Sequence, residues 1–76
     1  MTDLDQTDAI LWTLRKDERT ATAAMRVIRD FGVELRVLYN ESLRVGRLYS
    51  DVAAVLADAT ERRRELESRG WSPVCH

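Results

Sequence analysis

The sequence predicts an α+β domain, in which the strands of a sheet precede a long C-terminal helix. Residues 51–69 (DVAAVLADATERRRELESR) repeat apolar side chains at helical spacing. Residues 9–16 (AILWTLRK) and 33–39 (VELRVLY) instead alternate apolar and polar side chains, which is typical of half-buried strands. An amphipathic helix in a soluble domain must bury its apolar stripe, and the predicted strands supply the surface that it needs.

The C-terminal helix carries its own start and stop signals. Ser50 or Asp51 can accept hydrogen bonds from the first turn, and Gly70 follows Arg69 at the usual left-handed position after a helix. Asp58 with Arg62, and Glu65 with Arg69, are acid-before-base pairs four residues apart. Arg63 interrupts the apolar stripe, and we expect it to lay its methylenes on the sheet. The stripe consists of Val52, Val55, Leu56, Ala59 and Leu66.

The strand patterns assign side chains to the two faces of the sheet. In residues 9–16 we expect Ile10, Trp12 and Leu14 on the helix side, with Leu11 and Arg15 on the opposite side. Residues 44–49 (RVGRLY) form a further predicted strand, joined to residues 33–39 by a turn at residues 40–43. Within it, Gly46 indicates a β-bulge, which would turn Arg47 away from the core.

Residues 20–28 (TATAAMRVI) fit two structures. As a strand, the segment places Ala21, Ala23, Met25 and Val27 on one face. As a helix, it places Ala21, Ala24, Met25 and Ile28 on one stripe, with Gly32 as its stop signal. The helical version gives a β-α-β-β-α domain with residues 18–31 helical. The pattern of the residues does not decide between the two.

Several short motifs resemble a group of small bacterial proteins without an assigned activity. The motifs are W-x-L-R-K at residues 12–16, R-T-A at 19–21, G-x-E-L-R at 32–36 and G-W at 70–71. The resemblance covers roughly residues 10–71. It implies an antiparallel sheet with one helix, and a strand for residues 20–28. The fold that we predict is therefore a four-stranded antiparallel β-meander with one C-terminal helix packed on one face.

This fold predicts a hydrophobic core between the helix stripe and one sheet face. Because large buried side chains dominate core stability, truncation of Leu35 or Leu56 to alanine should cost about 2–5 kcal/mol. On the sheet, the predicted core residues are Ile10, Trp12, Leu14, Ala21, Ala23, Met25, Val27, Val33, Leu35, Val37, Tyr39, Val45 and Tyr49.

Length and composition predict one small cytoplasmic domain that gains from association. The chain has 76 residues, is 45% hydrophobic and has a net charge of −1. A domain of this size buries only about 60% of its unfolded surface, and one cysteine allows no internal disulfide. A homodimer or a bound partner would supply additional buried surface. We expect residues 9–71 to form the domain, between flexible tails at residues 1–8 and 72–76.

Few residues offer enzymatic or metal chemistry. The sole histidine, His76, follows the sole cysteine, Cys75, and two adjacent ligands do not make a closed metal site. No glycine-rich phosphate loop is present, and no carboxylate lies on an apolar segment that would raise its pKa. We therefore expect a protein that is not an enzyme and has no cofactor, no bound metal and no small-molecule substrate.

The sheet face without the helix is the predicted binding surface. Aliphatic and arginine side chains share this face, and such a mixture is typical of protein interfaces. We expect it to bind a partner protein or a second copy of the chain. The alternative is nucleic-acid binding through the same arginines, although the net charge is negative and no aromatic side chain is there to stack on bases. The predicted site consists of Leu11, Arg15, Arg26, Ile28, Arg36, Leu38, Arg44 and Leu48.

Overall fold

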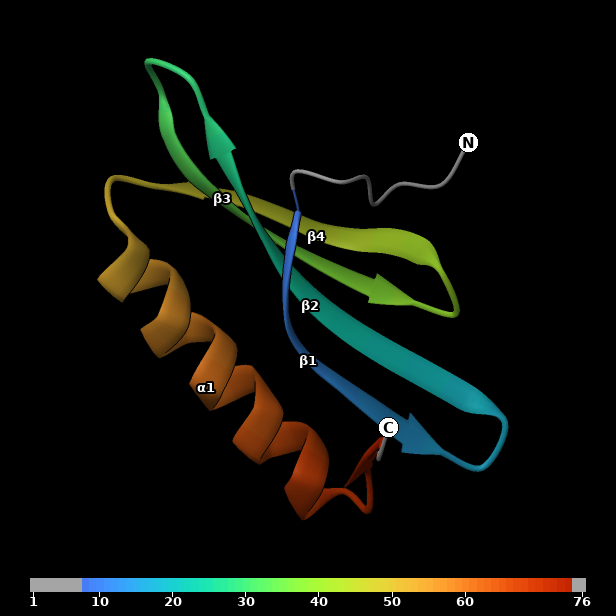
Figure 1. Ribbon diagram of the computed structural model, residues 1–76. Helices are drawn as coiled ribbons and strands as arrows, with labels where there is room; N and C mark the ends of the chain where they lie inside the picture. Colours follow the sequence, from blue (N-terminus) through green and yellow to red (C-terminus); the bar gives the residue numbers. More distant parts are fainter. Residues whose placement is uncertain (1–7, 75–76) are drawn as a thin grey trace.

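A computed structural model describes residues 8–74, which form five strands and one helix. The elements in chain order are β1 (Ala9–Lys16), β2 (Arg19–Ile28), β3 (Gly32–Tyr39), β4 (Ser42–Tyr49), α1 (Val52–Ser68) and β5 (Ser72–Pro73). The strands form one antiparallel sheet in the order β4-β3-β2-β1-β5, and α1 crosses one face of it (Figure 1). The predicted α+β fold, with its four-stranded meander and one C-terminal helix, is confirmed.

The ambiguous segment is a strand at the centre of the sheet. β2 pairs with β3 from Ala21↔Tyr39 to Ile28↔Gly32, and with β1 on its other side. Ala21 and Ala23 are fully buried on the helix side, where larger side chains would hold the helix away from the sheet. The alanines that favoured a helix are therefore packing residues of a central strand, and the β-α-β-β-α alternative is wrong.

The turns use the residues that left-handed backbone requires. Asn40 and Glu41 both have positive φ, 51° and 69°, in the two-residue turn between Tyr39 and Ser42. This geometry matches the right-handed twist of the flanking strands. Asn40 Oδ1 also accepts a hydrogen bond from the Thr20 backbone N–H, at 3.0 Å. Gly32 has φ +126°, and a Cβ there would lie 2.3 Å from the Tyr49 carbonyl oxygen, so a larger residue does not fit.

The predicted ends of the helix are confirmed. Asp51 is the N-cap, and its side chain accepts from the Ala54 N–H at 2.8 Å. At the other end, Gly70 has φ +96°, and the Trp71 N–H donates to the Leu66 carbonyl at 3.1 Å. This is the glycine-terminated arrangement that satisfies the last helical carbonyls. No helix among the described residues is long and apolar enough to cross a membrane.

The core lies between α1 and the middle of the sheet. Val55 and Ala59 are the buried residues of the helix, and they pack against the inward side chains of β1, β2 and β3. Most of the predicted inner-face residues lie in this core or pack against it. The buried cluster consists of Trp12, Leu14, Ala21, Ala23, Val33, Leu35, Val37, Val55 and Ala59.

A β-bulge in β1 exchanges two side chains relative to the prediction. The pairing shifts between Ile10↔Ala24 and Trp12↔Ala23, so Leu11 is the extra residue. Leu11 packs on the helix side, whereas Ile10 lies opposite Ala24 on the other face and is 53% exposed. The prediction that Ile10 points inward and Leu11 outward is wrong, because simple alternation does not account for an inserted residue.

A second β-bulge lies in β4 at Arg44, not at Gly46. Val45 pairs with Val37 and Leu43 pairs with Leu38, which leaves Arg44 without an opposite residue. Gly46 instead pairs regularly with Arg36, so Arg47 opposes Leu35 on the helix side. Arg47 is tolerated there because β4 is an edge strand, and its guanidinium lies over the Tyr49 ring, 5.6 Å from the ring centroid.

The boundaries of the domain extend further than predicted. Ser72 and Pro73 pair with Arg15 and Leu14 as β5, and the Val74 N–H donates to the Thr13 carbonyl at 3.0 Å. These residues were assigned to a C-terminal tail, but the turn after α1 brings them alongside β1. At the other end, Asp8 is bound to Arg26. Residues 1–7 and 75–76 of the two predicted tails lie outside the described residues.

The helix covers less of the sheet than predicted. Val27 lies on the helix side, opposite Val33, but is 71% exposed because β2 and β3 extend beyond the first turn of α1 (Figure 1). Leu56 was predicted to be a core residue, yet it is 44% exposed on the flank of the helix.

We expect Leu35→Ala to lower the free energy of unfolding by about 2–5 kcal/mol, because it leaves a cavity beneath the helix at a side chain with no exposed surface. Leu48→Ala is the matched control, because Leu48 is 54% exposed, and it should cost less than about 1 kcal/mol. Urea denaturation followed by circular dichroism measures both. Equal losses would show that Leu35 is not in the core.

Candidate interaction surfaces

Two of the predicted arginines on the helix-free face are bound to carboxylates. Arg26 makes a bidentate contact with Asp8, with Nε–Oδ1 at 2.6 Å and Nη2–Oδ2 at 3.1 Å. Arg36 donates to Glu34 at 3.2 Å and is 9% exposed. These pairs form because Glu34 and Arg36 are neighbours on one face of β3, and Asp8 directly precedes β1. The positive charge that this face offers to a ligand is correspondingly reduced.

The predicted aliphatic side chains do not form one patch. Leu11 lies on the opposite side of the sheet, Leu38 is 4% exposed and Ile28 is half-buried. Leu48 is 54% exposed, but it pairs with Glu34, and the Arg36–Gly46 pair separates it from Leu38. The predicted cluster of exposed aliphatic side chains is therefore absent from the helix-free face of the described residues.

The two remaining arginines of the predicted site lie on strands that are not neighbours in the sheet. Arg15 is exposed on β1, where its Nε donates to the Asp17 carbonyl at 3.0 Å. Arg44 is exposed at the β4 bulge. β2 and β3 lie between β1 and β4 in the sheet, so Arg15 and Arg44 do not form a continuous stripe.

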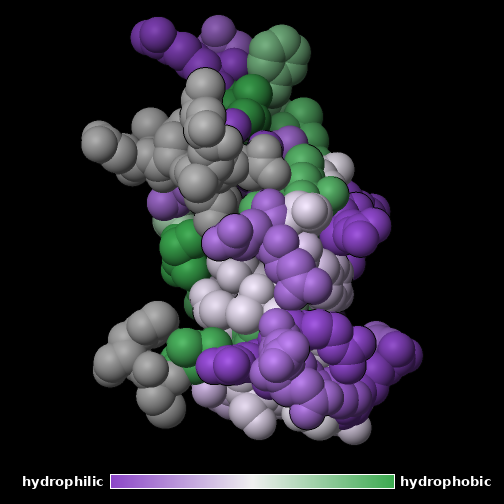
Figure 2. Space-filling model, turned by 90° about the vertical axis from the view of Figure 1, so that its right-hand side faces the viewer, coloured by the Kyte–Doolittle hydropathy of each residue, from purple (hydrophilic) through white to green (hydrophobic). Residues whose placement is uncertain are grey.

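Other exposed apolar side chains lie on the helix side. The helix leaves one corner of the sheet bare, next to its first two turns. Leu11 of the β1 bulge and Leu56 of α1 line one groove, and Val52 lies one turn before Leu56 on the same helix flank. Met25 and Val27 lie on the helix side of β2, opposite Leu35 and Val33. Figure 2, which views the side of the molecule away from α1, shows hydrophobic and hydrophilic surface together at the end where β2 and β3 meet, above a strongly hydrophilic opposite end. We call Leu11, Met25, Val27, Val52 and Leu56 the uncovered corner.

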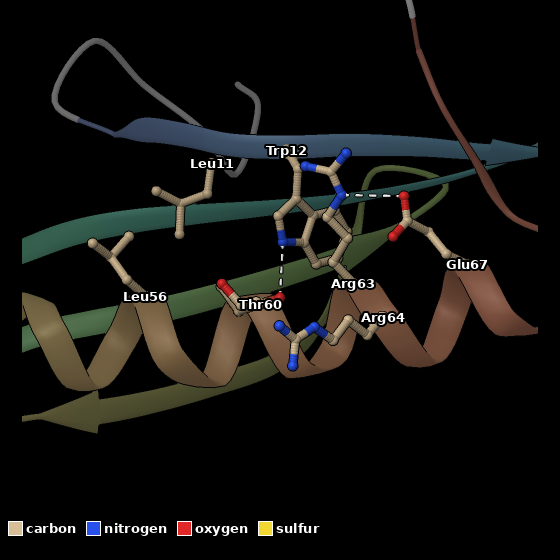
Figure 3. Close-up of a pocket in the computed structure, with 8 residues that line it drawn as sticks. Leu11, Trp12, Leu56, Thr60, Arg63, Arg64 and Glu67 are labelled. Carbon is tan, nitrogen blue, oxygen red and sulfur yellow. Dashed lines mark hydrogen bonds and ion pairs between the residues drawn. The ribbon is translucent and has the colours of Figure 1, made fainter.

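A groove of about 390 Å³ continues from the uncovered corner between β1 and α1. Leu11 and Leu56 face each other across its apolar end, and Trp12 forms its floor (Figure 3). Its other end is polar, because Arg63 lies beside Trp12 with its guanidinium bound to Glu67 at 3.3 Å. Arg63 thus lies on the sheet side of the helix, beside Trp12 of β1, as we expect from its position in the stripe. The groove is lined by Leu11, Trp12, Leu56, Ala59, Thr60, Arg63, Arg64 and Glu67.

The floor of the groove is held by a buried hydrogen bond. Trp12 Nε1 donates to the Ala59 carbonyl at 3.0 Å, and both residues are nearly fully buried. An indole N–H buried without a partner would cost about 1–3 kcal/mol, so this bond fixes both the ring and the position of the helix. The sequence pattern placed Trp12 in the core, but it contained no sign of its partner, which is 47 residues away.

On the other flank of α1, a polar network joins the helix to β4. The Tyr49 hydroxyl donates to Asp58 Oδ2, and Arg62 Nε donates to Asp58 Oδ1 at 2.9 Å. The predicted Asp58–Arg62 and Glu65–Arg69 pairs are both formed. The Tyr49 contact comes from the pairing of β3 with β4, which sequence spacing does not reveal.

This network shifts two pKa values. Burial favours the neutral form of Asp58, but the hydrogen bonds from Tyr49 and Arg62, and the charges of Arg62 and Arg47, outweigh it and lower the pKa of Asp58. The hydrogen bond to Asp58 is the main reason that the pKa of Tyr49 is raised, with desolvation and the Asp58 charge acting in the same direction. A tyrosine held protonated and a carboxylate held ionised thus join the helix to β4.

The described residues contain no group of three or more His, Cys, Asp or Glu side chains that could hold a metal ion. Cys75 and His76 lie outside the described residues. No family model, curated protein or solved structure matches the chain, so the resemblance to small bacterial proteins stays a prediction.

We expect Asp58→Asn to destabilise the protein most at neutral pH. The pKa of Asp58 is lower in the folded protein than in the unfolded chain, where it is about 4. The ionised carboxylate therefore stabilises the fold fully above about pH 4, and this stabilisation is lost as the pH falls through the folded pKa. The raised pKa of Tyr49 has the opposite sign, so its contribution is lost as pH rises through the folded value, above about 10.

Unfolding by urea, repeated across this pH range, measures the difference between wild type and Asp58→Asn. Glu61→Gln is the control, because Glu61 pairs only with Arg64 at the exposed surface of the helix. Its effect should be small at every pH. If the difference in free energy of unfolding between wild type and Asp58→Asn does not change with pH, the lowered pKa of Asp58 is contradicted.

Proposed function

We propose that the protein is a small, non-catalytic protein-interaction module of the cytoplasm, which binds a partner protein or a second copy of itself. The observation that carries this proposal is the uncovered corner. Val27, Val52 and Leu56 are each more than two-fifths exposed, at 71%, 41% and 44%, although all three lie on the helix side of the sheet. An apolar patch of this kind on a small domain marks an interaction site.

The groove beside the uncovered corner supports the same proposal. Its apolar end is continuous with the corner through Leu11 and Leu56, and Arg63 and Arg64 line its polar end. An interface with an apolar centre and an arginine-containing rim is the usual composition of protein contacts. Burying a fully exposed valine or leucine side chain contributes about 1.5–3 kcal/mol, so burying the remaining surface of the corner residues favours a complex.

The alternative of nucleic-acid binding has less support. It needs a positive stripe on the helix-free face, where Arg26 and Arg36 are bound to Asp8 and Glu34. Retention on heparin or DNA that falls steeply with salt would favour this alternative over the protein-interaction proposal.

The test compares wild type with Val27→Glu/Leu56→Glu. Both side chains are exposed, so the double variant should fold, but a charge in the corner should weaken association at least tenfold. Sedimentation velocity measures self-association, and quantitative affinity capture from the native host measures partner binding.

Ala53→Glu/Ala57→Glu is the matched control, because it adds the same charge at exposed positions on the solvent side of α1. The control should associate as wild type does. Association that survives in the corner variant, or a wild-type protein that is monomeric and captures no partner, would overturn the proposal.

A further inference from the structure

The outer edge of β4 is open along the sheet. Within residues 8–74, β4 pairs only with β3, and most of its eight residues are exposed. An edge strand presents a row of backbone N–H and C=O groups to solvent, and an extended segment of another protein can pair with them as an added strand.

The opposite edge of the sheet is closed to such pairing. β5 covers β1 at Leu14 and Arg15, and Val74 donates to the Thr13 carbonyl. Pro73 in β5 and the bulge at Leu11 interrupt the remaining edge. The contrast between the two edges makes β4 the accessible one among the described strands.

A regular stretch of β4 suits strand addition. From Val45 to Tyr49 every residue pairs in register with β3, from Val37 to Val33. The bulge at Arg44 ends this stretch at one end, and the capped start of α1 ends it at the other. An added strand would therefore pair with residues 45–49.

The side chains of β4 specify the chemistry of that strand. Leu48 is 54% exposed on the helix-free side, and Leu43 is 42% exposed beyond the bulge. Arg47 lies on the helix side, held over the Tyr49 ring. Neither Arg44 nor Arg47 forms an ion pair with a described residue, in contrast to Arg62 on the helix. The complementary strand carries apolar side chains on one face and carboxylates on the other.

The following inference rests on the proposed protein-interaction function and specifies the chemistry of the partner. We propose that β4 accepts an extended acidic segment of a partner protein, in which apolar and acidic residues alternate, as a sixth strand of the sheet. A second copy of the chain does not fit this edge, because antiparallel pairing of residues 45–49 with the same residues of another copy would place Arg47 opposite Arg47. Like charges on adjacent strands are destabilising, and edge arginines are a common protection against self-pairing.

The test measures binding of two synthetic peptides, VEVEVE and VKVKVK, which share one apolar face and differ in charge. Wild type should bind VEVEVE at least tenfold more tightly, with slowed amide hydrogen exchange at residues 45–49. Arg44→Gln/Arg47→Gln should lose this preference, and Arg44→Glu/Arg47→Glu should reverse it. The glutamine pair serves as the milder change, because a glutamate at position 47 would repel Asp58.

Two controls separate this edge from other surfaces. Arg15→Glu/Arg64→Glu makes the same change in net charge at exposed positions away from β4, and it should keep the preference for VEVEVE. Val27→Glu/Leu56→Glu should also keep it, so failure of the corner and failure of the edge are distinguishable. The proposal is overturned if the peptides bind equally or not at all, if protection appears outside β4, or if wild type dimerises through β4.

Discussion

The arrangement of the molecule depends on the contact between α1 and the sheet at Ala59. Ala59 is small and 2% exposed, so the helix approaches the strands closely, and its carbonyl accepts the hydrogen bond from Trp12. With Val55 one turn earlier, Ala59 forms the buried part of the helix. Large side chains at these positions would lift the helix from the sheet and break the Trp12 hydrogen bond. Little else on the helix is buried, so this contact determines which parts of the sheet stay bare.

The two flanks of the helix differ as a consequence. Toward β4, Asp58 closes the interface through its hydrogen bonds with Tyr49 and Arg62. Toward β1, no residue within 8–74 makes a comparable polar contact at the start of the helix, and Leu56 faces Leu11 across an open groove. The surfaces for which we propose binding roles therefore surround the helix and the β4 edge. The helix-free face is occupied in its centre by paired charges.

The sequence predicted the helix and strands well, but it predicted less well which side of the sheet each side chain occupies. Alternation and helical spacing depend on local backbone geometry, so the strands, the caps at Asp51 and Gly70 and the core side chains Trp12, Leu14 and Leu35 were all predictable. The β-bulges were not, because the extra residue is specified by pairing between strands. One inserted residue moved Leu11 from the predicted site to the groove, and the absence of the predicted bulge at Gly46 leaves Arg47 on the helix side. The exposure of Leu56 depends on how the helix crosses the sheet, which its stripe does not encode.

The placement of Leu11 tests the account most directly, because the β1 bulge brings Leu11 into both the groove and the uncovered corner. A nuclear Overhauser spectrum of the methyl groups measures it. We predict cross-peaks between the methyl groups of Leu11 and Leu56, and none between those of Leu11 and Leu38. Cross-peaks from Leu11 to Leu38 on the helix-free face, with none to Leu56, would contradict the account.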